Sequence, residues 1–295
     1  MGHSAGANIL SELKKMPGRL LERAFFEAPV VRVAPRLLGK LLVNRTRAGL
    51  ISGRIVEVEA YLGPHNETAD PAAHSHRGPT PRNRVLFGPA GHAYVYSIYG
   101  QYYCMNITCE MEGQAGSILL RALEPVAGLE QMARNRGLRA LPPISFDAAS
   151  QKGWRNHAIQ SATACWNGDG GSQPPRRESR ARQEWRSLCE LTGGPGRLCQ
   201  ALNLVREKHN GLDLLDPESP LQVRDDGRRA RRVLVTRRIG ISHAVDLPLR
   251  FAVPGHPCVS GARSLTGKCI FLRAETVRRM KLSPSRSTQQ KEFQS

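Results

Sequence analysis

Two glutamates and a tyrosine in the run Ile51–Tyr61 are spaced for acid–base chemistry. Side chains alternate along a strand, so one face is expected to carry Ile55, Glu57, Glu59 and Tyr61, and the other Val56, Val58 and Ala60. Cα atoms two residues apart on a strand are about 6.5 to 7 Å apart, within the range that inverting glycosidases use for a carboxyl pair. Apolar and aromatic neighbours should raise the pKa of Glu59, as a general base requires. Glu57 is the other candidate for the general base. The alternative for Glu59 is a solvated or salt-bridged position on the surface.

A cluster of aromatic residues follows, since five of the six tyrosines fall within ten residues: Tyr94, Tyr96, Tyr99, Tyr102 and Tyr103. Two strand-prone runs, Ala93–Ile98 and Tyr102–Thr108, are joined around Gly100, which predicts a hairpin. Tyr99 stands at its tip, where an exposed ring could wedge into a base stack. Aromatic packing within the sheet is the alternative, and it fits Tyr94 and Tyr103 best.

Histidines and arginines give weaker signals. His65, His74 and His76 share one loop, but without a further ligand at a recognised spacing they favour a neutral pocket histidine over a metal site. The glycine-rich run 193–196 leads into a predicted helix and could hold a phosphate, with an ordinary helix start as the alternative. The six arginines within 228–238 predict either a phosphate-contacting edge or a solvated face.

The composition points to a nucleic-acid partner. The chain has 295 residues, with 43 Lys and Arg against 25 Asp and Glu and a formal net charge of +18. Cations displace phosphate counterions and flat rings stack on bases, so this charge and the clustered tyrosines favour nucleic acid. No membrane-length apolar run or secretory leader is present, which predicts an intracellular protein. Seven cysteines without a CxxC pair are predicted to be reduced thiols, most of them buried.

The elements that must position these side chains mix strands and helices. Strands are predicted over 51–61, 93–98, 102–108, 117–123, 233–241 and 249–253, with helices within 6–28, within 35–43 leading into a strand, over 129–136 and after 193. We predict a single mixed α/β (α+β) domain over residues 20–273: a curved, mainly antiparallel sheet with surrounding helices and a protruding β-hairpin. Residues 1–19 are an N-terminal extension, 139–187 a loop insertion and 274–295 a polar tail.

Several longer blocks occur in a fixed order: Gly53–Pro64, Thr80–Asn83, Gly91–Gly100, Tyr103–Asn106, Leu119–Pro125, Gly194–Leu202, Arg238–His243 and Pro248–Phe251. Together they resemble the alkyladenine (3-methyladenine) DNA glycosylase family, over residues 20–140 and 188–260. One departure is Pro79, which replaces an arginine of bacterial-type members and implies the loss of one phosphate contact. A second is the 139–187 insertion, which holds all three tryptophans and which the family does not explain.

The resemblance implies a role for each matching side chain. Glu59 matches the glutamate that activates water for attack on C1′ of a flipped nucleotide, and Tyr99 the tyrosine that fills the gap left by the extruded base. The implied base pocket contains Tyr61, His74 and Tyr96, which sandwich and hydrogen-bond the base, Asn106, which crowds the 2-amino group of guanine, and Arg121, which supports the pocket. DNA-backbone contacts are expected from Arg82, Arg197, Arg228 and Arg229.

The implied activity is that of a monofunctional DNA glycosylase in base excision repair. It would excise alkylated or deaminated purines from double-stranded DNA and leave an abasic site. A purine alkylated at N3 or N7 is cationic, so electron-rich rings favour it and one carboxylate with water should suffice, without metal or cofactor. We expect a monomer in a bacterial cytoplasm, or in the nucleus of a eukaryote. Two other hypotheses stay open: a non-catalytic binder of damaged DNA, and a metal-dependent nuclease that uses His65, His74, His76 and Glu57.

Overall fold

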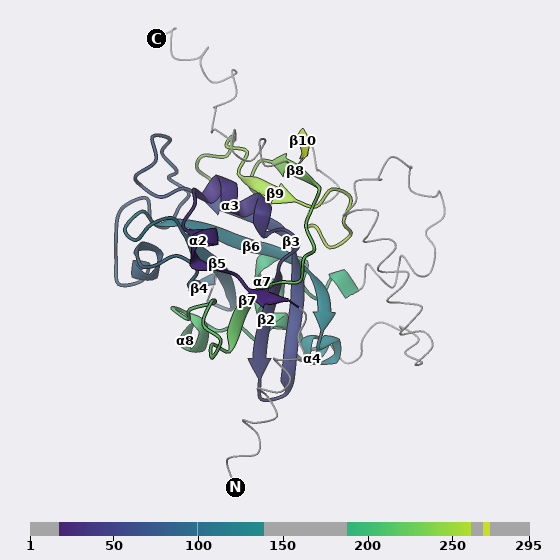
Figure 1. Cartoon of the computed structure of the whole chain (residues 1–295). Coiled ribbons are helices and arrows are strands. Elements are labelled where there is room, and N and C mark those ends of the chain that lie inside the picture. The colour runs from purple at the N-terminus through teal and green to yellow at the C-terminus, as the bar shows by residue number, and fades with distance from the viewer. Residues whose placement is uncertain (1–17, 99, 139–187, 261–267, 272–295) are drawn as a thin grey trace.

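The protein is described by a computed structural model that covers residues 18–98, 100–138, 188–260 and 268–271 (Figure 1). The predictions for the N-terminal extension before Gly18, for Tyr99, for the 139–187 insertion and for the 274–295 tail lie outside the described residues.

One curled antiparallel sheet runs through the described part of the chain. Its main path follows the order β1, β7, β2, β3, β6, β5, β4, while β9 joins β3 to β8, and β8 pairs with β10. The strands are β1 Arg19–Leu20, β2 Leu41–Thr46, β3 Gly49–Tyr61, β4 Ala93–Ile98, β5 Tyr102–Cys109, β6 Gly116–Ala127, β7 Leu221–Asp225, β8 Arg232–Thr236, β9 Arg250–Ala252 and β10 Lys268–Phe271. The predicted class, one mixed α/β domain with a mainly antiparallel sheet, is confirmed.

Short helices pack against this sheet (Figure 1). They are α2 Arg23–Phe26, α3 Val30–Leu37, the 3-10 helix η1 Arg84–Phe87, α4 Leu129–Asn135, α7 Pro195–Ala201 and α8 Arg206–His209. The apolar side chains of α3 recur at helical spacing and enter the core, where α3 contacts β3 and β6. α7 contacts β5 and β6, and α8 contacts β4. None of the helices in the described ranges has the length and apolar character of a membrane span.

β3 is the central strand and carries both candidate carboxylates. One of its edges pairs with β2 and then with β9, and the other edge pairs with β6. The pairing with β6 shifts register between Ile55 and Glu57 and again between Glu57 and Val58. Such β-bulges re-aim side chains, so the strict alternation expected for this run is interrupted beside the two glutamates.

The β4–β5 hairpin pairs as predicted from the sequence. Its register runs from Ala93 opposite Ile107 to Ile98 opposite Tyr102. Gly100 has a φ of 69°, a left-handed conformation that glycine adopts without strain. The protrusion of the hairpin depends on Tyr99 and stays a prediction.

Several boundaries differ from those predicted. The helix predicted within 35–43 spans Val30–Leu37, and the strand that follows it begins at Leu41. Arg19 and Leu20 are extended and not helical, because they pair with Asp225 and Arg224 of β7. β8 ends at Thr236 and does not continue to residue 241. Beyond that end, the chain turns so that the side chain of Arg238 enters the interior.

The prediction that the cysteines are reduced thiols is wrong for one pair. Cys189 and Cys258 form a disulfide across a sequence separation of 69 residues, with Cα atoms 4.6 Å apart. The segment that carries Cys189 is held beside β6 by a bridge between Gly193 and Ala122. No CxxC spacing could reveal this pairing, because tertiary contacts create it. Cys104, Cys109 and Cys199 are buried free thiols, as predicted.

Removal of this disulfide is expected to lower the free energy of unfolding. The Cys189→Ser/Cys258→Ser variant should lose about 3 kcal/mol in urea denaturation, because the cross-link restricts the unfolded chain. A thiol reductant should lower the stability of the wild type to that of the variant and leave the variant unchanged. Equal stability of the oxidised and reduced wild type would contradict a structural disulfide.

Candidate active site

Glu59 is fully buried near the end of β3, with 0% of its surface exposed. Its Oε1 accepts a hydrogen bond from the backbone N–H of Ile239 at 2.8 Å and lies 3.2 Å from Nη1 of Arg121. Its Oε2 accepts a hydrogen bond from the hydroxyl of Tyr61 at 3.1 Å. Donors from β3, from β6 and from the segment after β8 therefore fix the orientation of this carboxyl group.

Burial raises the pKa of Glu59 above its ordinary value, because a carboxylate removed from water is destabilised. The cation of Arg121, the N–H of Ile239 and the hydroxyl of Tyr61 oppose this rise, while the charge of Glu57 adds to it. A buried carboxylate with a raised pKa has the proton affinity that a general base needs.

Glu57, the competing carboxylate, is held by four donors. Its Oε1 accepts from Nε of Arg121 at 3.0 Å, from Nε of Arg250 at 2.6 Å and from the hydroxyl of Ser260 at 2.8 Å. Its Oε2 accepts the backbone N–H of Ser260 at 2.6 Å. Two arginines and Ser260 bind Glu57, which fits a structural role, whereas Glu59 has one arginine and the hydroxyl of Tyr61 as side-chain partners. Glu59 remains the stronger candidate for the base.

His74, Tyr94 and Tyr96 form an aromatic cluster. The ring centroids of Tyr94 and Tyr96 are 5.0 Å apart at an interplanar angle of 24°, and the imidazole of His74 meets the ring of Tyr96 edge-on at 4.6 Å. Burial raises the pKa of Tyr96, and the nearby Cys104 and Tyr61 contribute to that rise. Because Tyr61 also binds Glu59, the aromatic cluster adjoins the carboxylate site.

His74 suits a pocket better than a metal site. Its Nδ1 lies 3.1 Å from the hydroxyl of Tyr94. Partial burial of the ring and the cation of Arg82 lower the pKa of His74, so the imidazole is neutral near pH 7. Among the residues that the structure describes, no group of three His, Cys, Asp or Glu side chains could hold a metal ion. The four side chains considered for a nuclease are not gathered into one site.

Asn106 presents an unpaired buried acceptor. It lies on β5 between Tyr94 of β4 and Leu119 of β6 in the sheet register. Its Nδ2 donates to the hydroxyl of Ser117 at 3.0 Å, but Oδ1 has no hydrogen-bond partner among the described residues. A buried polar atom without a protein partner is normally satisfied by a water molecule or by a ligand group.

A buried ion pair holds the ring of Tyr61. The guanidinium of Arg238 lies 4.6 Å from the ring centroid, and its Nη1 and Nη2 each donate to Asp70 at 2.7 Å. Both charged side chains are 0% exposed. Asp70 belongs to the loop after β3, so this loop helps to orient the candidate site through Arg238.

Comparison with known proteins identifies the family. The sequence matches the methylpurine-DNA glycosylase family over residues 24–257. It is 43% identical over 245 residues to a protein of Koribacter versatilis strain Ellin345, covering 83% of this chain and 95% of that relative. A protein of Methanoculleus marisnigri is 41% identical over 244 residues, covering 81% of this chain and 98% of the relative. Both relatives carry the name "Putative 3-methyladenine DNA glycosylase".

This chain belongs to the methylpurine-DNA glycosylase family. The predicted resemblance is confirmed, and the protein is a DNA glycosylase for alkylated bases that acts in DNA repair.

Several residues that contact the candidate site were not predicted from the sequence. The backbone N–H of Ile239 and the Asp70–Arg238 pair were not singled out, nor were Arg250 and Ser260. Arg238, Ile239 and Arg250 lie within the blocks that carry the family resemblance, which was the one available signal. Asp70 and Ser260 lie outside those blocks, and their contacts exist only in the folded chain.

The arginines expected at the DNA backbone occupy two regions of the glycosylase. Arg82 contacts the carbonyl of Ser97 in β4 at 3.4 Å. Arg197 lies in α7, beside Gly196, whose backbone approaches the ring of Tyr102 at the start of β5. Both are exposed near the hairpin.

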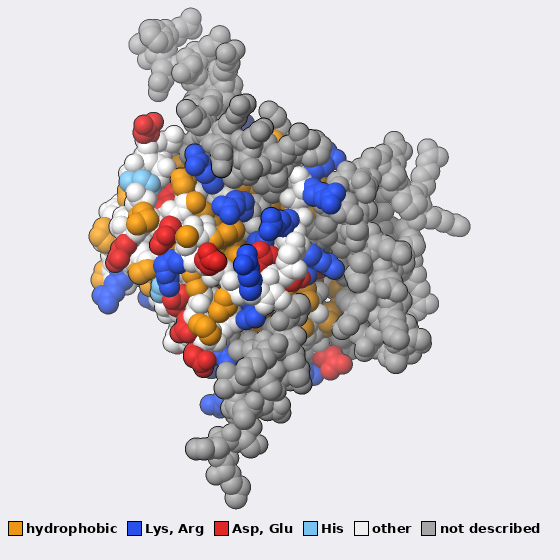
Figure 2. Space-filling view, viewed as in Figure 1, with side chains coloured by type: hydrophobic (Ala, Val, Ile, Leu, Met, Phe, Trp, Pro, Cys, Tyr) orange, Lys and Arg blue, Asp and Glu red, His pale blue; other side chains and the backbone are white. Residues whose placement is uncertain are grey.

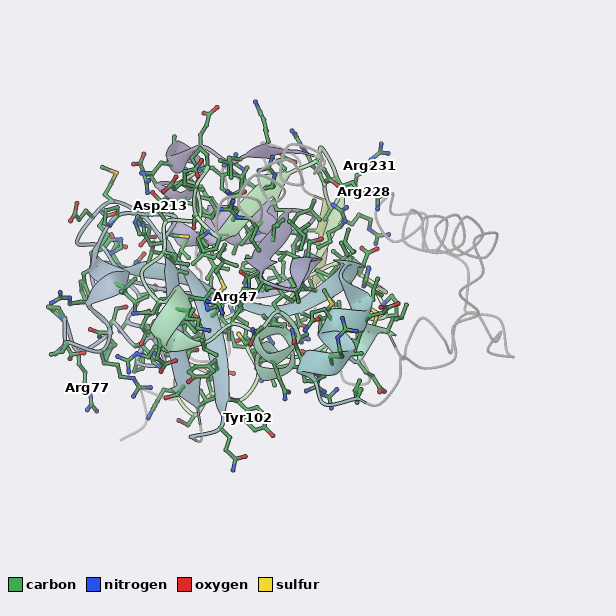
Figure 3. All side chains as sticks on the ribbon, turned by 90° about the horizontal axis from the view of Figure 1, so that it is seen from below. Arg47, Arg77, Tyr102, Asp213, Arg228 and Arg231 are labelled. Atoms are coloured by element: carbon green, nitrogen blue, oxygen red, sulfur yellow. A yellow bond between two sulfur atoms is a disulfide. The ribbon has the colours of Figure 1, made fainter. Side chains whose placement is uncertain are left out.

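Arg228 and Arg229 lie far from that hairpin. They follow β7, which is near the opposite end of the sheet path from β4 and β5. Figure 3 shows Arg228 and Tyr102 on opposite sides of the molecule. Arg229 lines a groove with four other cationic side chains: Arg19, Arg32, Arg36 and Lys40. Figure 2 shows Lys and Arg gathered in the middle of the face that it presents, with Asp and Glu between them.

The Tyr61→Phe variant should release base more slowly in acid. The Tyr61 hydroxyl stabilises the ionised form of Glu59, so its loss is expected to raise the pKa of Glu59 further and to move the acid limb of the pH–rate profile to higher pH. Single-turnover base release at several pH values measures this limb. Tyr103→Phe is a matched control, because the Tyr103 hydroxyl contacts the exposed Glu207 at 3.4 Å. An unmoved acid limb in Tyr61→Phe would show that the Tyr61 hydroxyl does not influence the ionisation of Glu59.

Proposed function

We propose that the protein flips an alkylated or deaminated purine out of double-stranded DNA and hydrolyses its N-glycosidic bond. Water attacks C1′ of the flipped nucleotide, the C1′–N bond breaks, and its electron pair leaves with the base. Glu59 takes the proton that the water loses. A cationic alkylated purine leaves as the neutral base, whereas a deaminated purine leaves as an anion that takes up one proton from solvent, and the products are the free base and an abasic site. The observation that carries this proposal is the buried carboxylate of Glu59, held by Arg121, Tyr61 and Ile239 beside the aromatic cluster.

We assign the damaged base to a pocket formed by Tyr61, His74, Tyr96, Asn106 and Arg121. Electron-rich rings attract a purine that carries positive charge after alkylation at N3 or N7. The stacked Tyr94 and Tyr96 rings and the edge-on His74 ring supply such faces. The unpaired Oδ1 of Asn106 and its place on β5 support a role in discriminating the groups on the base.

We assign the gap left by the flipped base to Tyr99. Ile98 and Tyr102 are the last paired residues of the β4–β5 hairpin, and Tyr99 lies between them in sequence. A ring at such a turn can replace the extruded base in the stack. Arg82 and Arg197, both exposed near the same hairpin, are proposed to contact the DNA backbone beside it. We propose that Arg228 and Arg229 contact the DNA backbone farther from the hairpin.

We propose that the reaction needs no metal and that the enzyme is a monofunctional hydrolase working as a monomer. A cationic purine is already a good leaving group, so one general base and water are sufficient for its departure. A lyase would require an amine that forms a Schiff base. Both carboxyl oxygens of Glu59 are bound by donors other than lysine, and no lysine lies beside Glu59 or in the tyrosine-rich run.

Base release from defined lesions tests this function. Duplexes containing 3-methyladenine, 7-methylguanine, hypoxanthine or 1,N6-ethenoadenine are incubated with the full chain in EDTA, and abasic sites are then cleaved with alkali. We expect strand cleavage after alkali and none before it. Tight binding without base release would favour a damage binder. Cleavage without alkali would indicate a lyase or a nuclease, and a complete block by EDTA would refute the metal-free reaction.

A further inference from the structure

Two carboxylates and two guanidinium groups share one buried cluster at the centre of the sheet. Glu57 and Glu59 are 0% exposed, Arg250 is 3% exposed and Arg121 is 7% exposed. The formal charges of the two glutamates and the two arginines in this cluster sum to zero. In a low-dielectric interior an unbalanced charge is costly, so the loss of either arginine should change how the two carboxylates share the remaining cation.

Arg121 is shared between the carboxylates, whereas Arg250 binds only one of them. Nε of Arg121 donates to Glu57 at 3.0 Å, and its Nη1 lies 3.2 Å from Glu59. Nε of Arg250 donates to Glu57 at the shorter distance of 2.6 Å. Glu57 therefore contacts two arginines and Glu59 contacts one.

The fold holds Arg250 firmly on Glu57. Arg250 stands opposite Glu59 in the β3–β9 register and opposite Thr236 in the β8–β9 register. Its Nη1 donates to the Thr236 hydroxyl at 3.3 Å and its Nη2 to the carbonyl of Ser260 at 2.6 Å. The guanidinium of Arg250 therefore has three hydrogen-bond partners. It cannot move towards Glu59 without losing its contacts to Thr236 of β8 and to Ser260.

We propose that Arg250 is a positioning residue for the glycosylase reaction: by neutralising Glu57, it leaves the cation of Arg121 available to Glu59. This inference rests on the proposed role of Glu59 as general base. Without Arg250, Arg121 is drawn to Glu57, and Glu59 loses its counter-charge. The charged and titratable groups that face Glu59 are Glu57 and Tyr61 from β3, Arg121 from β6, Cys104 from β5 and Arg250 from β9, with Arg238 behind Tyr61.

The test compares Arg250→Gln with Arg250→Lys, which keeps the charge, and with Arg134→Gln, which removes the charge of an exposed arginine of α4 that lies 4.0 Å from Glu130. Single-turnover base release is measured against pH with the full chain. We expect Arg250→Gln to lose about tenfold in rate on the acid limb and little on the alkaline plateau. Arg250→Lys should restore most of the acid-limb rate, and Arg134→Gln should leave the limb in place. An even loss at every pH, or an unmoved limb, would overturn the proposal.

A second measurement does not depend on catalysis. The ionisation of the Glu59 carboxyl group is followed by carbon NMR in the free protein, with its signal assigned by its absence in Glu59→Gln. The midpoint should move to higher pH in Arg250→Gln and return towards the wild-type value in Arg250→Lys. If Arg250→Gln does not fold, the double variant Glu57→Gln/Arg250→Gln removes both charges of this pair. Its Glu59 midpoint should lie at or below the wild-type value, because Arg121 then has Glu59 as its only carboxylate partner in the cluster, and a higher midpoint would overturn the proposal. Wild type without base release would instead refute the proposed function.

Discussion

Replacement of Glu59 by glutamine should lower the single-turnover rate constant for base release by about 10²- to 10⁴-fold, the usual contribution of a general base. Glutamine keeps the shape, its single oxygen can still accept the N–H of Ile239, and its amide N–H can donate to the oxygen of Tyr61, but it cannot take a proton from water. DNA affinity should change little. Glu67→Gln, which alters an exposed carboxylate in the loop after β3, is the matched control and should keep the wild-type rate.

The same variant should not be less stable than the wild type. The pKa of Glu59 lies above 4.5 in the folded protein, so the folded state binds this proton more tightly than the unfolded chain does. The stability that this group contributes is present below pH 4.5 and is lost as the pH rises through the folded-state pKa. Glutamine avoids that loss, so the melting temperature near pH 7 should be equal or higher. A large drop would point to a structural salt bridge and against a catalytic carboxylate.

The Asp70→Asn variant should lose about 4 kcal/mol of unfolding free energy. It leaves the guanidinium of Arg238 without its counter-ion where both side chains are 0% exposed, and breaking a buried pair from one side is strongly destabilising. The loss should also loosen the ring of Tyr61, over which Arg238 lies. Urea denaturation of the full chain measures the effect.

An exposed ion pair provides the matched control for this substitution. Asp246 lies 2.8 Å from Arg237, and the two side chains are 54% and 68% exposed. Asp246→Asn should therefore cost less than about 1 kcal/mol. A similar small cost for Asp70→Asn would show that the Asp70–Arg238 pair does not hold this part of the site together.

Local patterns were enough to predict the elements that carry the chemistry. β3, the β4–β5 pairing and α4 follow from alternation, from turn residues and from helical spacing, all of which act over a few residues. The register shifts beside Glu57 could not be predicted, because they depend on how β6 and β9 meet the two edges of β3.

The contacts around the two carboxylates lie beyond any local pattern. Ile239 reaches Glu59 across 180 residues of sequence, Arg238 reaches Asp70 across 168, and Arg250 reaches Glu57 across 193. The Cys189–Cys258 pair is of the same kind. Each of these contacts forms only when the sheet brings distant parts of the chain together. Local sequence patterns could therefore not predict them, and the family resemblance pointed to some of the residues but not to the contacts.

The positions of the charged side chains in the folded protein differ from what the net charge alone suggested. The net charge of +18 suggested nucleic acid, yet the charged groups around Glu59 are buried and nearly balanced. Exposed cations lie both near the hairpin and at the other end of the sheet, around Arg229. Net charge therefore favours DNA as the partner, while the paired buried charges act on the carboxyl group of Glu59, the proposed general base.

The ratio of wild-type to Glu59→Gln rate constants, measured under single-turnover conditions against pH on one lesion, tests the general-base role most directly. Ionisations of the substrate affect both proteins and cancel in the ratio. A general base predicts a ratio that is constant at high pH and falls tenfold per pH unit in acid, with a midpoint above the ordinary glutamate value of 4.5. A ratio that stays near one, or that does not change with pH, would contradict the role of Glu59.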